Sequence, residues 1–178
     1  IFNITQNLTM SAWINVRQAG SHAQDGIIIQ KGGKLNGEGY FLAHTWLSNA
    51  TTAYVYVNTT SGGSRQQITA PAQSVRMNQW YHVAATYDGY TLRLYTNGME
   101  VANLATNPND VINHSGSDGG DINIGNRVEF NNVGFNGTID EVMIYRRTLT
   151  PEEIRTHYLR GSGYGASGAI TADKFRVV

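Results

Sequence analysis

A pair of alternating strands joined by a glycine turn constrains this chain more than any other feature. It occupies residues 79–99, QWYHVAATYDGYTLRLYTNGM. Asp88-Gly89 supplies the turn between the strands, because glycine adopts positive φ at little cost, and Asn97-Gly98 begins a second turn. Alternation places one apolar set on a single side of the two strands: Val83, Ala85, Tyr87, Leu92 and Leu94. The stretch therefore predicts an antiparallel hairpin whose one face is buried.

The first strand of the chain alternates as cleanly, over residues 8–16. Its apolar positions are predicted to face the core: Leu8, Met10, Ala12, Ile14 and Val16. Trp13 falls on the opposite face with Ser11 and Asn15. A tryptophan on that side is either a platform for a ligand or a ring covered by a neighbouring loop, and we favour the covering loop.

Further strands are predicted at 26–33, at 39–46 paired with 51–60, at 121–127 and at 138–146. A helix follows, because Thr150 and Glu153 have the spacing of a capping box and Pro151 takes the first helical position. We expect this short helix to run over residues 150–158.

Four stretches in a fixed order resemble one protein family. They are the hairpin pattern W-YHVAATYDG-YTLRLYTNG, LTMSAWINV at 8–16, DINIGNR at 121–127, and FNGTIDEVMIYRRTLTPEEI at 135–154. Together they are similar to the laminin-G-like, concanavalin A-like jelly-roll family. The resemblance implies an all-β, two-sheet antiparallel jelly-roll sandwich with one short helix. It implies no single function, because the family includes lectins, carbohydrate-binding modules, adhesins and passive spacers.

Length and charge limit the number of domains and the classes of partner that this chain can have. The chain has 178 residues, which suit one domain, and a formal net charge of zero. We expect a jelly roll over 1–158, a Gly/Ser-rich linker over 159–168 and a separate strand over 169–178. The sequence begins inside a predicted strand, so we interpret it as a mature or excised piece. No basic stripe favours nucleic acid, and no apolar run reaches the length of a membrane span.

Acceptor motifs for N-linked glycans point to an extracellular or cell-surface protein. They begin at Asn3, Asn7, Asn49, Asn58, Asn113 and Asn136. The alternative is that a β protein rich in Asn and Thr produces such motifs by chance. Cysteine is absent, which excludes disulfides and thiolate metal sites.

The last ten residues, 169–178, look displaced. Members of the family open with a strand that directly precedes the T-x-S-A-W strand, and this chain lacks it. Its C-terminal GAITADKFRVV resembles the missing piece. Three explanations remain: a circular permutation, a tandem array cut out of register, or a strand donated to the next copy in a fibre. We favour donation between units, with Ile170, Phe175 and Val177 at the subunit interface.

Aromatic residues on the second strand pair suggest a sugar-binding surface. Tyr54 and Tyr56 share a face, and Trp46 lies near the end of the preceding strand. The alternative for all three is cross-strand packing. The irregular, oxygen-rich stretch at 105–121 is a second candidate for function.

Catalysis is not expected. The best carboxylate pair is Asp140-Glu141, and strict alternation through 138–146 would put Asp140 with Val142 and Ile144 and leave Glu141 on the opposite face. No nucleophile-elbow, zinc-protease or phosphate-loop motif occurs. The resemblance instead implies a structural Ca²⁺ held by Asp140 and Asp173. The alternative is that Asp140 caps a turn or meets Arg147.

Two function classes follow from these observations. The first is a non-catalytic structural or adhesive module, a repeat or subunit of a surface fibre joined to copies of itself by strand complementation. The alternative is a carbohydrate-binding, lectin-like module.

Overall fold

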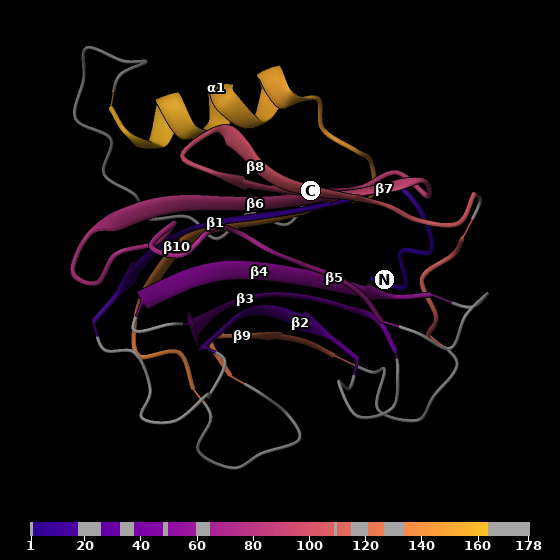
Figure 1. The fold of residues 1–178 in the computed structure, drawn as a ribbon, viewed down its shortest axis with the longest axis horizontal. Helices are drawn as coiled ribbons and strands as arrows, with labels where there is room; N and C mark the ends of the chain where they lie inside the picture. Colours follow the sequence, from indigo (N-terminus) through magenta and orange to yellow (C-terminus); the bar gives the residue numbers. More distant parts are fainter. Residues whose placement is uncertain are drawn as a thin grey trace.

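The computed structural model describes residues 2–17, 26–32, 38–47, 50–59, 65–108, 110–114, 121–126 and 134–163. Within them the chain forms two antiparallel five-stranded sheets stacked face to face, with one helix above the first sheet (Figure 1). The predicted two-sheet sandwich with one short helix is therefore confirmed.

Sheet A carries the helix on its outer face. Its strand order is β10 (Gly137–Tyr145), β1 (Leu8–Val16), β6 (Trp80–Tyr87), β7 (Thr91–Thr96) and β8 (Met99–Ala105). Sheet B has the order β5 (Arg65–Thr69), β4 (Ala50–Asn58), β3 (Tyr40–Leu47), β2 (Gly26–Lys31) and β9 (Ile122–Ile124).

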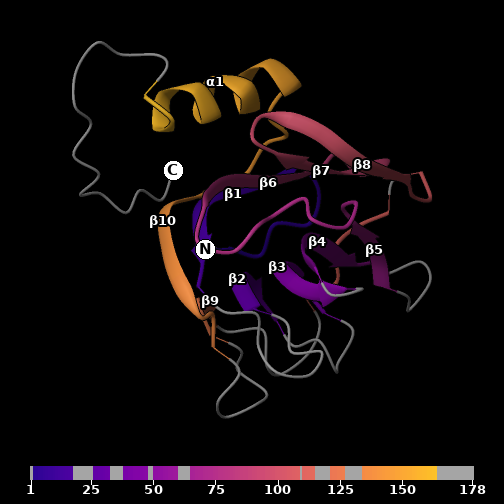
Figure 2. The ribbon, with the colours of Figure 1, turned by 60° about the vertical axis from the view of Figure 1, so that its left-hand side comes forward.

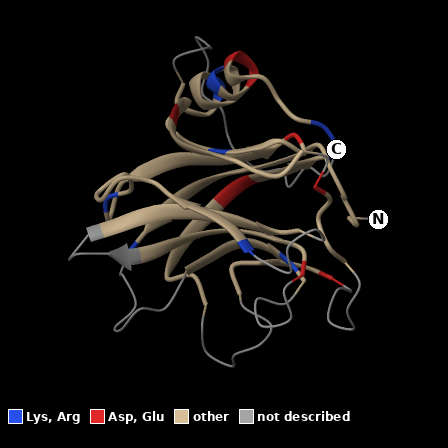
Figure 3. Cartoon of the chain, turned by 45° about the vertical axis from the view of Figure 1, so that its right-hand side comes forward, with Lys and Arg blue, Asp and Glu red and all other residues tan. Residues whose placement is uncertain are grey.

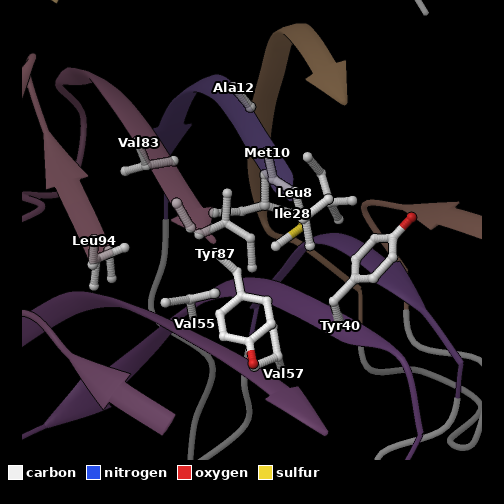
Figure 4. Packing of buried hydrophobic residues seen from close by; sticks show 14 of the residues in the cluster. Leu8, Met10, Ala12, Ile28, Tyr40, Val55, Val57, Val83, Tyr87 and Leu94 are labelled. Atoms are coloured by element: carbon white, nitrogen blue, oxygen red, sulfur yellow. The ribbon is translucent and has the colours of Figure 1, made fainter. Parts of the chain in front are cut away.

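The core lies between the sheets and is built from the positions that alternation selected. All eight residues that most constrain the strand phases are at most 1% exposed: Leu8, Met10, Ala12, Ile14, Val83, Ala85, Leu92 and Leu94. Sheet B contributes side chains that include Ile28, Tyr40, Val55 and Val57 (Figure 4). Burying each large apolar side chain contributes roughly 1.5–3 kcal/mol to stability, so the phases of β1, β6 and β7 are strongly fixed.

Helix α1 (Pro151–Gly161) begins as the sequence predicts and ends later. The Thr150 hydroxyl accepts from the Glu153 N–H at 3.2 Å, and the Glu153 carboxylate accepts from the Thr150 N–H at 2.8 Å. The helix continues past the predicted end at residue 158, and the Ser162 N–H caps it by donating to the Tyr158 carbonyl at 2.9 Å. Ile154 is buried against Tyr95 of sheet A, which fixes the helix to that sheet.

β10 departs from simple alternation at a β-bulge. Ser11 pairs with Met143 and Trp13 with Asp140, so two residues of β10 lie opposite the single residue Ala12. The bulge reverses the phase of the strand. Ile139, Val142 and Ile144 all pack on the core, so the prediction that Ile139 and Val142 face opposite sides is wrong.

Candidate functional site

One cavity that the described residues form lies on the outer face of sheet A, beneath the end of α1. We call it the helix-side pocket. Its volume is about 400 Å³, and three strands, the β7–β8 turn and the helix end all contribute to it. It is lined by Trp13, Trp80, Asn97, Asp140, Glu141, Tyr158, Gly161 and Ser162. Its size falls within the range of about 300–1,000 Å³ that is usual for small-molecule pockets.

Trp13 forms the wall between the sheet and the helix. Its ring stacks on Tyr158 with centroids 5.7 Å apart and an interplanar angle of 26°, and it lies 5.6 Å from the ring of His82. Gly161 allows the helix end to approach, because a Cβ at that position would overlap the Trp13 Nε1. Trp13 is 9% exposed. It is therefore covered as predicted, but by the helix rather than by a loop.

Trp80 supplies the open aromatic surface of the pocket. It is the first residue of β6 and is 46% exposed. Asn97 lies beside it in the turn that joins β7 to β8, and its Oδ1 accepts from the His82 backbone N–H at 3.0 Å. Trp80 was not predicted as a site residue, because its position at the start of a strand gives no sign of which surface it joins.

The bulge brings two adjacent carboxylates to one side of the pocket. Glu141 has a φ of 47°, in the left-handed region that glycine usually occupies at a bulge of this kind. The Glu141 N–H donates to Asp140 Oδ1 at 2.8 Å, which holds the bulge closed. Both residues line the pocket. The prediction that they point to opposite faces is therefore wrong, because it assumed an unbroken strand.

Burial and like charge shape the ionisation of this pair. Burial raises the pKa of Glu141, and the neighbouring Asp140 carboxylate raises it further. On the other side of Trp13, burial lowers the pKa of His82 to about 3, with a smaller contribution from His157. At neutral pH the imidazole behind the aromatic wall of the pocket is therefore neutral.

The predicted calcium site combines Asp140 with Asp173. Among the described residues there is no group of three or more His, Cys, Asp or Glu side chains placed to hold a metal ion. Ca²⁺ takes six to eight oxygen ligands, of which Asp140 and Glu141 would supply a share. Asp173 lies outside the described residues, so the calcium site stays a prediction.

The predicted sugar platform on sheet B is a packed surface in this structure. Tyr54 and Tyr56 are 2% and 1% exposed. Phe41 lies between them, stacked on Tyr56 at 4.7 Å and tilted toward Tyr54 at 5.7 Å, and the Arg65 guanidinium lies over Tyr56. This geometry matches the cross-strand packing alternative. The side chain of Trp46 lies outside the described part of the chain, and the binding role of all three residues stays a prediction.

The predicted glycosylation sites differ in accessibility. Asn3, Asn7 and Asn136 are exposed, and Asn113 is half-buried. Asn58 is 2% exposed, and its Nδ2, the atom that would carry a glycan, donates to the Glu38 carbonyl at 2.8 Å. The prediction of a glycan at Asn58 is therefore corrected, since attachment would break this buried bond. Asn49 lies outside the described residues.

The predicted donation of the strand at 169–178 needs an open sheet edge to which the strand can be added. In the described part of the chain β10 pairs only with β1, so its other edge has no strand beside it. β9 ends sheet B on the same side, where the Phe135 N–H donates to the Gly125 carbonyl at 2.8 Å (Figure 2). The apolar residues near this side are only half-buried: Ile122, Ile124, Phe135 and Ile139. Residues 169–178, including Ile170, Phe175 and Val177, lie outside the described residues.

Among solved structures, carbohydrate-binding domains have folds similar to that of this chain. The carbohydrate-binding module (CBM40) of a Ruminococcus gnavus sialidase superposes with a TM-score of 0.68 at 20% identity, covering 88% of this chain and 84% of that one. That module has also been solved with α2,3-sialyllactose. Domain 4 of an extracellular arabinanase from Geobacillus stearothermophilus, in complex with arabinotriose, gives 0.56 at 21% identity, covering 85% and 66%. At these identities the likeness shows the fold alone.

A heptameric pentraxin from Limulus polyphemus gives a TM-score of 0.58 at 17% identity and covers 86% of this chain and 70% of that one. No curated protein sequence matches this chain. A family model does match it, over residues 1–155, which include both sheets and the beginning of α1. The resemblance carried by the four ordered motifs is thus confirmed, and the chain belongs to the concanavalin A-like lectin/glucanases superfamily.

Proposed function

We propose that this chain is a non-catalytic carbohydrate-binding module that holds a saccharide in the helix-side pocket. The observation that carries the proposal is the half-exposed Trp80 ring beside two carboxylates in one cavity of about 400 Å³. An aromatic ring packs well on the apolar face of a sugar, and ionised carboxylates form strong hydrogen bonds with its hydroxyls. Likeness to two carbohydrate-binding domains supports this function over the fibre subunit that we placed first from the sequence.

The proposed location is extracellular or at the cell surface. The acceptor motifs at Asn3, Asn7 and Asn136 are exposed, as glycan attachment requires. In the described residues we find no helix with the length and hydropathy needed to cross a bilayer. Acidic and basic residues both occur in the described part of the chain (Figure 3), and a formal net charge of zero does not favour nucleic acid as a partner.

The two carboxylates are proposed to bind rather than to catalyse. Glycoside hydrolysis needs carboxyl groups on either side of the scissile bond. Asp140 precedes the bulge and Glu141 is its first residue, and as neighbours in the chain that line one pocket they would approach a ligand from the same side. Asp140 Oδ1 is also engaged by the Glu141 N–H. A saccharide incubated with the protein should therefore remain intact.

Replacing Trp80 by alanine tests the binding site. We expect about tenfold weaker saccharide binding, since one aromatic contact contributes about 0.5–1.5 kcal/mol in addition to its buried apolar area, and 1.4 kcal/mol is a factor of ten. Isothermal titration with a panel of oligosaccharides measures the effect.

Tyr90→Ala is the matched control for this variant, because Tyr90 is 51% exposed but lies in the turn between β6 and β7, away from the pocket. It should bind as the unaltered protein does. Equal loss in both variants, or loss only when Trp46 is replaced, would move the saccharide to another surface.

A second function, a fibre subunit joined by strand complementation, is favoured by one specific observation. The outer edge of β10 has no neighbouring strand in the described part of the chain, and half-buried Ile139 and Phe135 lie near it. Soluble proteins rarely leave such an edge open. Residues 169–178 of a neighbouring copy would add a strand there and bury Ile170, Phe175 and Val177.

Deleting residues 169–178 tests this second function. We expect shortened units that remain soluble, melt at a lower temperature and no longer associate, and a synthetic peptide of these residues should restore the melting temperature. A peptide with Ile170, Phe175 and Val177 replaced by serine is the control and should not. A full-length protein that sediments as a compact monomer at high concentration would exclude the fibre.

A further inference from the structure

We propose that the helix-side pocket selects saccharides that carry a positive charge, that is amino sugars with a free ammonium group, over neutral and acidic ones. This inference rests on the proposed carbohydrate-binding function and adds the class of sugar to it. It is carried by the charges around the pocket, by the way the bulge holds the two carboxylates, and by an indole N–H in the pocket wall.

The charged residues that line the pocket have one sign, and Arg160 in the last turn of α1 lines a separate cavity with Glu152 and Glu153. Asp140 and Glu141 line the helix-side pocket, and no Lys or Arg is among the described residues that do so. The C-terminal end of α1 is also there, through Tyr158, Gly161 and Ser162. The end of a helix carries roughly half a negative charge from its aligned peptide dipoles. These groups together attract an ammonium and repel the carboxylate of an acidic sugar.

The Asp140 carboxylate is held by the Glu141 N–H, and neither carboxylate pairs with a cation among the described residues. In the described part of the chain neither Asp140 nor Glu141 forms an ion pair, whereas the acidic groups Asp88 and Glu153 pair with Arg93 and Arg147. The left-handed backbone at Glu141 is rare for a residue with a long side chain, and such conformations concentrate at functional sites. Burial and the nearby Asp140 also raise the pKa of Glu141, which a bound cation would relieve.

Trp13 adds a hydrogen-bond donor that a bare metal ion would leave unused. Its side chain is nine-tenths buried, and its Nε1 has no hydrogen-bond acceptor among the described residues. Nε1 lies against Gly161 in the wall of the pocket. Nε1 is itself buried against Gly161, so a sugar oxygen reaches it only when the helix end moves aside, whereas the open Trp80 ring can pack on the sugar while the carboxylates bind its ammonium. The combination therefore fits an amino sugar better than Ca²⁺.

The test compares three ligands by isothermal titration with the full chain at about pH 6, where a free amino sugar is protonated. They are the tetrasaccharide of glucosamine, that of N-acetylglucosamine, and sialyllactose. We expect the glucosamine ligand to bind at least tenfold more tightly than its acetylated form, sialyllactose to bind most weakly, and the preference to shrink as salt screens the charges.

Two variants test whether the charge of the pocket carboxylates, rather than their size or the overall charge of the protein, causes the preference. Asp140→Asn combined with Glu141→Gln keeps the shape and the bulge hydrogen bond, and should abolish the preference for the free amine. Glu152→Gln removes one negative charge from an exposed residue outside the pocket, and should leave the preference unchanged.

The outcomes distinguish the inference from the function on which it rests. Equal binding of the two tetrasaccharides, or tighter binding of sialyllactose, overturns charge selection and leaves carbohydrate binding standing. Loss of binding in EDTA shows that the carboxylates hold a metal ion and also overturns the inference. If none of a broad saccharide panel binds, the proposed function falls together with it.

Discussion

Replacing Trp13 by alanine should lower the free energy of unfolding by about 3–5 kcal/mol, the range found when large buried aromatic residues are truncated. Trp13 joins the only described helix to sheet A, because its ring stacks on Tyr158 and lies beside His82. Its removal leaves a cavity between α1 and β1 and widens the pocket. Denaturant unfolding measured by circular dichroism gives the change.

Trp80→Ala is the natural control for Trp13→Ala, since it removes the same side chain from the same pocket at a position that is 46% exposed. It should change stability by less than about 1 kcal/mol, because surface substitutions usually have small effects. If both variants lose equal stability, Trp13 does not hold the helix to the sheet.

Acid should destabilise this protein through His82. Burial lowers the pKa of His82 to about 3, whereas an unfolded histidine has a pKa near 6.5. Between these values the unfolded state binds a proton that the folded state does not, so stability is full above about pH 6.5 and is lost as the pH falls toward 3. The pKa difference corresponds to about 4–5 kcal/mol by linkage. His82→Gln, which cannot titrate, should therefore have a flatter stability profile over this range.

The comparison isolates His82, because other acid-sensitive groups are the same in both proteins. Glu141 acts in the opposite direction: its pKa is raised in the folded state, so the cost of its charge is relieved as the pH falls. His157→Gln is the matched control. His157 is half-buried on α1, where burial and Arg160 lower its pKa, and its replacement should flatten the profile less. Parallel profiles for the unaltered protein and His82→Gln would contradict the buried, neutral imidazole.

Much of the fold could be predicted because local signals there agree with the final packing. The alternation in β1, β6 and β7 selects residues that are nearly inaccessible in the structure, such as Met10 and Leu94. The capping box at Thr150 forms with both of its hydrogen bonds. These features depend on neighbours in the chain and on a single buried face, so the sequence carries them directly.

The site could not be predicted in the same way, because it depends on two departures from regular structure. A bulge at Glu141 carries no glycine to mark it, and it reverses the side to which the following residues point. The helix also extends to Gly161, where the composition suggested a linker, and so reaches Trp13. The pocket then combines residues from three strands, a turn and a helix end, an arrangement that only the packed structure reveals.

The helix-side pocket as the saccharide site is tested most directly by the indole N–H signals in a two-dimensional NMR spectrum of the ¹⁵N-labelled protein. The chain has 3 tryptophans, so the spectrum should contain two indole probes in the helix-side pocket, Trp13 and Trp80, and one on sheet B, Trp46. On titration with the glucosamine tetrasaccharide, the signals of Trp13 and Trp80 should shift and saturate together while that of Trp46 stays in place. A shift of Trp46 alone, with Trp13 and Trp80 unmoved at saturation, would contradict the helix-side site.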